Sequence, residues 1–293
     1  MAGCACEGDA NPGTIRKART FLSSVLRHAA ESEAIPGNPL SLVRAPQQSH
    51  HDAIEPLSPA TVEAIRRALL EPAPREIAAA RPGQRSRRRY ELPPPGTPQT
   101  WRRDALIVSL LAYAGLRPGE LRALRLADVR EGTILVQRAA NPDGSVKATK
   151  TQHGRSVRLV APLSQDVREY RLASGRPPSS ALLLADDDGG PWDKTAWQLW
   201  RVDRWAPACR AAGLDQVPRP YDLRHSLASL LLAEGRQPLY GARQLGHSLA
   251  VLLSTYAHLI DEYAESRQRI DAEAEITKAR SIWCVSDVRQ TVG

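Results

Sequence analysis

The chain has 293 residues and a formal net charge of +8, with 40 Lys and Arg against 32 Asp and Glu and only 5 % aromatic residues. This surplus favours a polyanionic partner contacted through phosphates more than through base stacking, although an arginine-rich, high-GC genome explains part of it. The four cysteines form no CxxC pair and no apolar run has signal-peptide or membrane-spanning character, which argues against a zinc site, secretion and a membrane protein.

The N-terminal part is predicted to be helical and then to break. Apolar residues recur at helical spacing over residues 14–34, whereas residues 36–59 are rich in proline and polar residues and are predicted to be an interdomain linker. A second helix is predicted at "SPATVEAIRRALL", with Ser58 as its N-cap and Pro59 at its first position. Residues 71–98 are predicted to be an exposed basic insertion, whose arginines either contact phosphate or belong to a solvated loop.

The central part combines helices with a small sheet. "TWRRDALIVSLLAYAG" is an apolar helix that Gly115 is expected to close, and another helix follows at "LRPGELRALRLADV". Residues 133–138 and 155–160 have strand character, and the turn residues between them allow a short middle strand. We therefore predict an antiparallel meander with Lys150 at its second turn. Helices are predicted for the rest of the chain, so the fold class is mainly α (α+β).

Separate segments place cationic or polar side chains at the ends of these elements. The residues are Arg117 in "AGLRPGEL", Lys150 in "ATKTQHGRSVRL", Arg224 in "YDLRHSLAS" and His247 in "QLGH". Tyr256 in "STYAHL" follows His247 by nine positions. Arg224 and His225 precede an apolar helical run, at a helix N-terminus that favours anions. Taken singly, each residue has an ordinary structural explanation, such as a helix cap, a solvated charge or a core position.

In this order and spacing, the five motifs resemble those of the tyrosine recombinase, or phage integrase, family. The resemblance covers about residues 53–271 and implies a helical catalytic domain with a small antiparallel sheet. It implies site-specific cutting and rejoining of double-stranded DNA at attachment-type sites, with Tyr256 as the nucleophile and a 3′-phosphotyrosine intermediate. It further implies a homotetramer on DNA, located in the cytoplasm with the nucleoid, and no cofactor, metal or membrane.

The residue types suit this chemistry. The guanidinium groups of Arg117 and Arg224 can clamp an anionic phosphate through paired hydrogen bonds. A tyrosine with an ordinary pKa near 10 needs a proton acceptor or a strongly cationic site, and Lys150 can protonate the departing 5′ oxygen. His247 would bind the phosphate or transfer a proton. A rival metal-dependent nuclease would need clustered carboxylates, but the only tight cluster, Asp186–Asp188, is interpreted as a solvated turn.

The site departs from the family pattern at one position. Tyr221 stands where the family most often has histidine. A phenol donates and accepts hydrogen bonds but does not change protonation near neutral pH. We therefore expect a slower reaction rather than an abolished one. His225 is expected to support the phosphate site from beside Arg224.

Both ends of the chain leave alternatives open. Residues 1–48 resemble only the last two helices of the family's DNA-clamping core-binding domain, together with the linker. The alternative hypothesis is therefore a truncated, catalytically poor remnant that acts only as a DNA-binding protein. Residues 272–293 form a helix-prone C-terminal tail, which packs either on its own domain or, as the resemblance implies, on a neighbouring subunit.

Overall fold

The fold comes from a computed structural model, in which the chain divides into two units, Met1–Ile54 and Glu55–Gly293. The residues that the structure describes are 12–43, 55–73, 75–79, 88–92, 96–148, 154–175, 177–266 and 269–290. Within these ranges, every helix is too short or too polar to cross a lipid bilayer.

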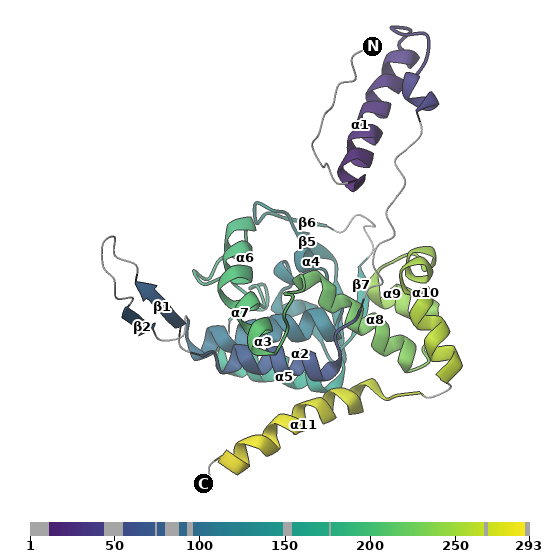
Figure 1. Cartoon of the computed structure of the whole chain (residues 1–293). Coiled ribbons are helices and arrows are strands. Elements are labelled where there is room, and N and C mark those ends of the chain that lie inside the picture. Colours follow the sequence, from purple (N-terminus) through teal and green to yellow (C-terminus); the bar gives the residue numbers. More distant parts are fainter. Residues whose placement is uncertain are drawn as a thin grey trace. The chain divides into compact units, whose positions relative to one another are not determined.

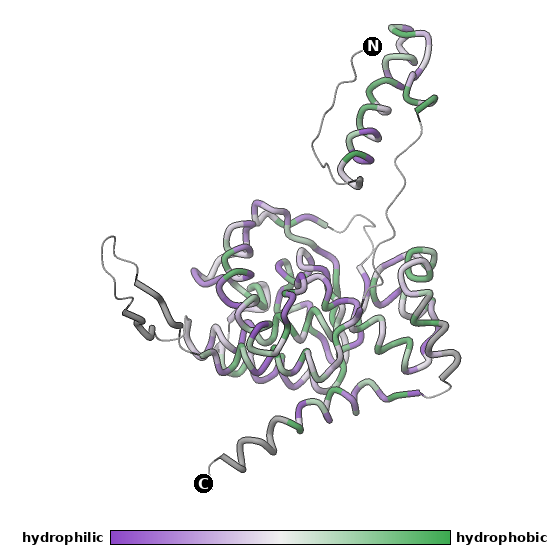
Figure 2. Tube along the Cα trace, in the orientation of Figure 1, coloured by the Kyte–Doolittle hydropathy of each residue, from purple (hydrophilic) through white to green (hydrophobic). Residues whose placement is uncertain are grey.

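The described part of the first unit is one long helix with a helical turn folded back on it. Helix α1 (Pro12–Glu31) is followed by the turn η1 (Pro39–Leu42), and the Arg19 guanidinium donates to the Leu40 carbonyl oxygen at 2.9 Å. Apolar side chains of α1, such as Phe21 at 74 % exposure, stay at the surface, and Figure 2 shows hydrophobic and hydrophilic residues alternating along this helix. Elements this small bury little apolar surface of their own.

Helix α3 (Pro98–Tyr113) is the central helix of the second unit, and all its residues from position 103 onward are buried. It contacts α2 (Pro59–Leu70), α5 (Ala161–Ala173) and α8 (Leu223–Ala233), as can be followed in Figure 1. Because neighbours cover α3 on several sides, apolar residues occur all around it. The mainly helical fold class predicted from the sequence is confirmed.

Local capping residues set the ends of these helices as predicted. The Ser58 hydroxyl accepts a hydrogen bond from the Thr61 backbone N–H at 3.1 Å at the start of α2. After α3 the chain reverses at Gly115, whose φ is +59°, and leads directly into α4 (Pro118–Arg122). A Cβ at Gly115 would lie 2.7 Å from Cδ2 of Leu227, so both the backbone conformation and the close packing require glycine.

The strands of the central region form two small antiparallel sheets, not the single meander predicted. The strands are β3 (Val129–Arg130), β4 (Thr133–Val136), β5 (Arg138–Ala140), β6 (Val146–Ala148) and β7 (Arg155–Arg158). In the larger sheet β4 lies between β3 and β7, with Ile134 opposite Val157. Strands β5 and β6 pair only with each other among the described strands.

The meander does not form because the chain leaves the larger sheet at Gln137. The Asp128 carboxylate accepts hydrogen bonds from the Gln137 side-chain amide at 3.2 Å and from the Arg138 guanidinium at 2.6 Å. These bonds hold the start of β5 away from β4, so β7 is the strand that returns to β4. The hairpin of β5 and β6 therefore stands apart from the sheet.

Residues 71–98 contain two paired strands. A solvated basic loop was one of the alternatives predicted for this insertion. Strand β1 (Arg75–Ala79) pairs antiparallel with β2 (Arg88–Leu92), with Ile77 opposite Tyr90. The loop prediction is wrong for these two segments, because each satisfies the backbone hydrogen bonds of the other. Phosphate contact by the arginines of this insertion stays a prediction.

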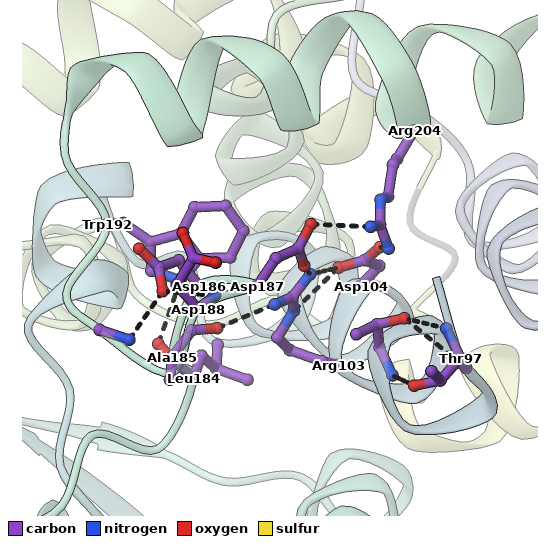
Figure 3. Close-up of polar contacts among 12 residues, drawn as sticks. Thr97, Arg103, Asp104, Leu184, Ala185, Asp186, Asp187, Asp188, Trp192 and Arg204 are labelled. Atoms are coloured by element: carbon purple, nitrogen blue, oxygen red, sulfur yellow. Dashed lines mark hydrogen bonds and ion pairs between the residues drawn. The ribbon is translucent and has the colours of Figure 1, made fainter. Parts of the chain in front are cut away.

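The acidic turn at Asp186–Asp188 is exposed to solvent at Asp187 and Asp188, as predicted, and it is also held by arginines. The Asp187 carboxylate accepts hydrogen bonds from Arg103 at 2.7 Å and from Arg204 at 2.8 Å (Figure 3). Both arginines also contact Asp104 of α3, so the turn is fastened to the core helix. Within the part of the chain that the structure describes, no three His, Cys, Asp or Glu residues are grouped to hold a metal ion.

The remaining helical elements are η2 (Leu126–Asp128), α6 (Lys194–Trp200), η3 (Arg201–Trp205), α7 (Ala206–Ala211), η4 (Pro220–Asp222), α9 (Pro238–Leu245), α10 (Leu249–Ser266) and α11 (Ala272–Gln290).

The C-terminal helix, α11, packs on its own unit. Helix α11 contacts α2, α5 and α8, and its Ile276 is buried in the core. Its Arg280 donates to Asp166 at 2.7 Å and pairs with Glu63 at 3.3 Å. Of the two placements expected for the tail, the structure has the one on its own domain.

Candidate active site

Two of the expected arginines meet at the C-terminal end of α9. Arg117, at the start of α4, donates from Nη2 to the Gly246 carbonyl oxygen at 2.8 Å. Arg224, in the first turn of α8, donates to the carbonyl oxygens of Leu245 and Gly115. The turns after α3 and α9 and the start of α8 thus bring together residues that lie more than a hundred positions apart in the chain.

Glu120 orients two guanidinium groups at this point. It accepts hydrogen bonds from Nη1 of Arg117 at 2.8 Å and from Nη1 and Nη2 of Arg155 at 2.7 Å each. Burial opposes the ionisation of Glu120, but the hydrogen bonds and charges of Arg155 and Arg117 outweigh it and lower its pKa to about 2. The helix cap considered for Arg117 is therefore present, and it fixes the arginine inside the site.

Arg224 is completely buried, at 0 % exposure. Burial, followed by repulsion from Arg117 and Arg155, lowers its pKa to about 10, so the guanidinium keeps its charge at neutral pH. Its Nε is buried and has no hydrogen-bond partner among the described residues. A buried guanidinium N–H without a partner is costly, and an anionic oxygen would satisfy it.

His247 lies in the turn between α9 and α10 and is neutral. Burial, followed by the charges of Arg224 and Arg117, lowers its pKa to about 4. Its Nδ1 is buried and also lacks a hydrogen-bond partner within the described part of the chain. The histidine therefore adds an uncharged hydrogen-bonding group beside the arginines.

Tyr256 of α10 lies near Arg224, and its side chain is fully buried. Its hydroxyl is 2.6 Å from Nδ1 of His225, and the Tyr221 ring meets the His225 ring edge-on at 5.8 Å. Burial raises the pKa of Tyr256, and the charge of Arg224 opposes this rise only in part. The backbone of Tyr256, at φ −122° and ψ 18°, interrupts the helical geometry of α10. The nucleophile expected from the sequence is thus at the site but covered.

A basic groove of about 1120 Å³ runs beside the site. Its lining includes five cationic or histidine side chains, namely Arg117, Lys147, Arg155, Arg243 and His247. Lys150 lies outside the described residues, so its predicted role stays a prediction. Arg155, Lys147 and Arg243 were not among the expected site residues, and the basic string "HGRSVRL" around Arg155 was the one sequence feature that pointed to it. Because β7 packs against α9, Arg155 reaches the site only in the folded chain.

The arrangement is suited to binding a tetrahedral anion next to a phenol. Three guanidinium groups, those of Arg117, Arg155 and Arg224, concentrate positive charge, with Glu120 as the counterion that orients two of them. Such preorganised donors stabilise negative charge that develops on phosphate oxygens. The phenol of Tyr256 supplies a hydroxyl that can form a covalent bond with phosphorus.

Comparisons with known proteins show which family this chain is similar to. A model described as the phage integrase family matches residues 97–262. The tyrosine recombinase XerC of Methylobacterium nodulans is 30 % identical over 221 residues, which cover 74 % of this chain and 62 % of that protein. A tyrosine recombinase of Pseudothermotoga lettingae is 28 % identical over 160 residues, covering 55 % of this chain and 51 % of that protein. The chain spans about half to three fifths of the length of these curated relatives.

Solved structures share the fold. The Tn1549 transposon integrase in complex with a circular intermediate DNA superposes with a TM-score of 0.64 at 18 % identity, covering 88 % of this chain and 79 % of that chain. A lambda integrase tetramer bound to a Holliday junction gives a TM-score of 0.53 at 16 % identity, covering 80 % of this chain and 58 % of that chain. The catalytic-domain fold implied by the sequence motifs is confirmed.

Proposed function

The chain belongs to the phage integrase family, and from this premise we propose that it is a site-specific DNA recombinase that acts through a 3′-phosphotyrosine intermediate. The observation that carries the proposal is that Arg117 and Arg224 meet beside a basic groove, with Tyr256 close to Arg224. Phosphate contacts along such a groove bind DNA without reading its sequence.

The proposed reaction uses the side chains of the site. Arg117 and Arg224 bind the scissile phosphate, and Nε of Arg224 and Nδ1 of His247 gain the partners that they lack. The Tyr256 oxygen forms a bond to phosphorus while the bond from phosphorus to the 5′ oxygen breaks. Lys150 protonates the departing 5′ oxygen, and a 5′ hydroxyl from another strand later reverses the step. No metal ion takes part in these steps.

DNA binding must uncover the nucleophile for this reaction. Tyr256 and Arg224 are both at 0 % exposure, so no phosphate reaches either of them without movement. The movement has to displace the groups that cover the two side chains, while Tyr256 stays beside His225 of α8. We infer that the covered arrangement belongs to the chain before it engages DNA.

The proposed partner is double-stranded DNA with attachment-type sites, on which four copies of the chain assemble. Two similar structures support this proposal: the Tn1549 transposon integrase is in complex with a circular intermediate DNA, and the lambda integrase is a tetramer bound to a Holliday junction. Such a protein would act in the cytoplasm, associated with the nucleoid. Since α11 packs on its own unit, contacts between copies would have to use other surfaces or require α11 to move.

A second candidate function is DNA binding without recombination. The complete burial of Tyr256 and Arg224 favours it, because a chain that never opens would hold DNA in the basic groove without cutting it. The two candidates differ in one product, the covalent adduct between protein and DNA.

Tyr256→Phe tests the proposed function. Duplexes that the wild-type chain selects from a random-sequence pool, nicked to prevent rejoining, should trap a covalent adduct on a denaturing gel. Tyr256→Phe removes one oxygen and should abolish the adduct while DNA binding persists. Tyr263→Phe is the matched control, since this tyrosine lies on the same helix, and its adduct level should equal that of the wild type. An adduct with Tyr256→Phe would refute the nucleophile, and no adduct with the wild type would favour the binding-only protein.

A further inference from the structure

His225 and Tyr256 form a buried contact between two helices. His225 lies in the first turn of α8 and Tyr256 lies in α10, and Nδ1 of the histidine is 2.6 Å from the phenolic oxygen. The two residues are 7 % and 0 % exposed. Water therefore has little access to the contact, and a proton on it can move directly between the two groups.

The direction of this hydrogen bond follows from the two environments. Burial raises the pKa of Tyr256, so the phenol keeps its proton at neutral pH and donates it. Burial lowers the pKa of His225, with a further decrease from Arg224 and an opposing effect of Asp222. The imidazole is therefore neutral, Nδ1 accepts, and the ring proton is on Nε2.

The other polar groups of the site are poorer proton acceptors than His225. Tyr221, at the position where the family motif most often has histidine, has a phenol that does not accept a proton near neutral pH. His247 has a pKa lowered to about 4, which makes it a weaker base than an ordinary histidine. Arg224 carries a permanent charge. Within the described residues, His225 is the neutral base in contact with the Tyr256 hydroxyl.

We propose that His225 is the catalytic base that takes the proton of Tyr256, in place of the histidine that the family motif has at the position of Tyr221; the proposal rests on the proposed recombinase function. As the bond from the phenolic oxygen to phosphorus forms, the phenolic proton passes to Nδ1 and an imidazolium results. The bond from phosphorus to the 5′ oxygen breaks, and the 5′ oxygen takes a proton from Lys150. In the rejoining step Nδ1 returns its proton to the departing phenolic oxygen.

The position of His225 favours this transfer once DNA is bound. His225 directly follows Arg224 on α8, so the base and a phosphate ligand belong to one rigid element. A bound phosphate brings negative charge to a place where Arg224 otherwise disfavours an imidazolium. Phosphate binding therefore makes His225 a better base at the moment when the phenol must lose its proton.

The test measures single-turnover adduct formation on the nicked duplexes described above. His225→Ala should slow adduct formation by about 10²-fold to 10⁴-fold, the usual contribution of a general base. Added imidazole should restore part of the rate, and substituted imidazoles should do so in the order of their basicity. A residue that only packs against Tyr256 would give no dependence on the basicity of the added base.

His225→Asn distinguishes proton transfer from hydrogen bonding. Asparagine is smaller than histidine but offers an oxygen near the position of Nδ1, which accepts a hydrogen bond and takes no proton at neutral pH. We expect it to be as slow as His225→Ala while folding and DNA binding persist. Ser229→Ala is the matched control, because Ser229 Oγ lies 2.9 Å from the Tyr263 hydroxyl and joins the same two helices. Its rate should equal the wild-type rate.

The pH dependence gives an independent readout. The wild-type rate should fall as the pH drops through the pKa that His225 has in the DNA complex, because the imidazolium accepts no proton. His225→Asn should lack this fall. Among the described residues, the charged or titratable groups that face His225 are Arg219, Tyr221, Asp222, Arg224, His247 and Tyr256. If His225→Asn forms adduct at the wild-type rate, or if imidazole does not rescue His225→Ala, the proposed role of His225 is overturned. If the wild-type chain forms no adduct, the recombinase function itself is overturned.

Discussion

Glu120→Gln perturbs the ion pairs that orient two arginines of the active site. The Glu120 side chain is 3 % exposed and pairs with Arg117 at 2.8 Å and with Arg155 at 2.7 Å. Burial opposes its ionisation, yet the hydrogen bonds from Arg155 and Arg117 lower its pKa from 4.5 to about 2. At about 1.4 kcal/mol per pKa unit, this shift corresponds to about 3 kcal/mol of folding free energy at neutral pH.

The glutamine variant should lose this stabilisation. Its amide is uncharged and leaves two neighbouring guanidinium groups without their counterion, so the free energy of unfolding at pH 7 should fall by about 3 kcal/mol. For a unit of this size that corresponds to a decrease in Tm of about 6–12 °C. Because the pKa of Glu120 is lower in the folded chain, its stabilisation is complete above pH 4.5 and is lost as the pH falls toward 2. The wild type and the variant should therefore converge in that range.

Urea unfolding followed by tryptophan fluorescence measures the effect. Glu71→Gln is the control, since Glu71 pairs with Arg67 at 3.2 Å with its own side chain 62 % exposed. Exposed pairs of this kind contribute about 0.3–0.5 kcal/mol, so the control should stay close to the wild type. A Glu120→Gln variant whose stability also lies within about 0.5 kcal/mol of the wild type at pH 7 would refute the reasoning.

Three further predictions concern catalysis, DNA binding and the C-terminal helix. Arg117→Ala should slow adduct formation by roughly 10²-fold to 10³-fold but weaken DNA binding much less, because the groove keeps its other cations. Equal losses in a cleavage assay and in a binding titration would contradict this. DNA affinity should fall by roughly 10³-fold to 10⁵-fold between 50 and 200 mM salt if 6–10 phosphates are contacted, and a flat titration would exclude the groove as the DNA surface. Ile276→Ala should lower the free energy of unfolding by about 2–5 kcal/mol, whereas unchanged stability with impaired assembly on DNA would mean that α11 docks on another copy.

Features that depend on near neighbours in the chain could be predicted from the sequence. Ser58 caps α2 and Gly115 ends the α3 segment because each acts on backbone groups within a few positions. The helical class and the expected positions of Arg117, Arg224 and His247 at element ends have this origin. The five motifs identified the family through their order and spacing along the chain, which can be read without the fold.

The tertiary structure decided the contacts between distant segments. The order of the strands depends on Asp128 holding Arg138, and the placement of the acidic turn depends on Arg103 and Arg204, which no local pattern reveals. The C-terminal helix has the same few apolar residues whether it packs on its own unit or on another, so its partner could not be predicted from the sequence.

The site itself depends on both levels. The residue types of Arg224 and Tyr256 and the spacing of their motifs were visible in the sequence, but their complete burial was not. The pairing of Arg155 with Glu120 spans 35 positions, and that of His225 with Tyr256 spans 31. Such pairs form only when helices and strands from different parts of the chain pack together, because packing sets the distance between side chains. The sequence by itself determined only which side chains were available to meet.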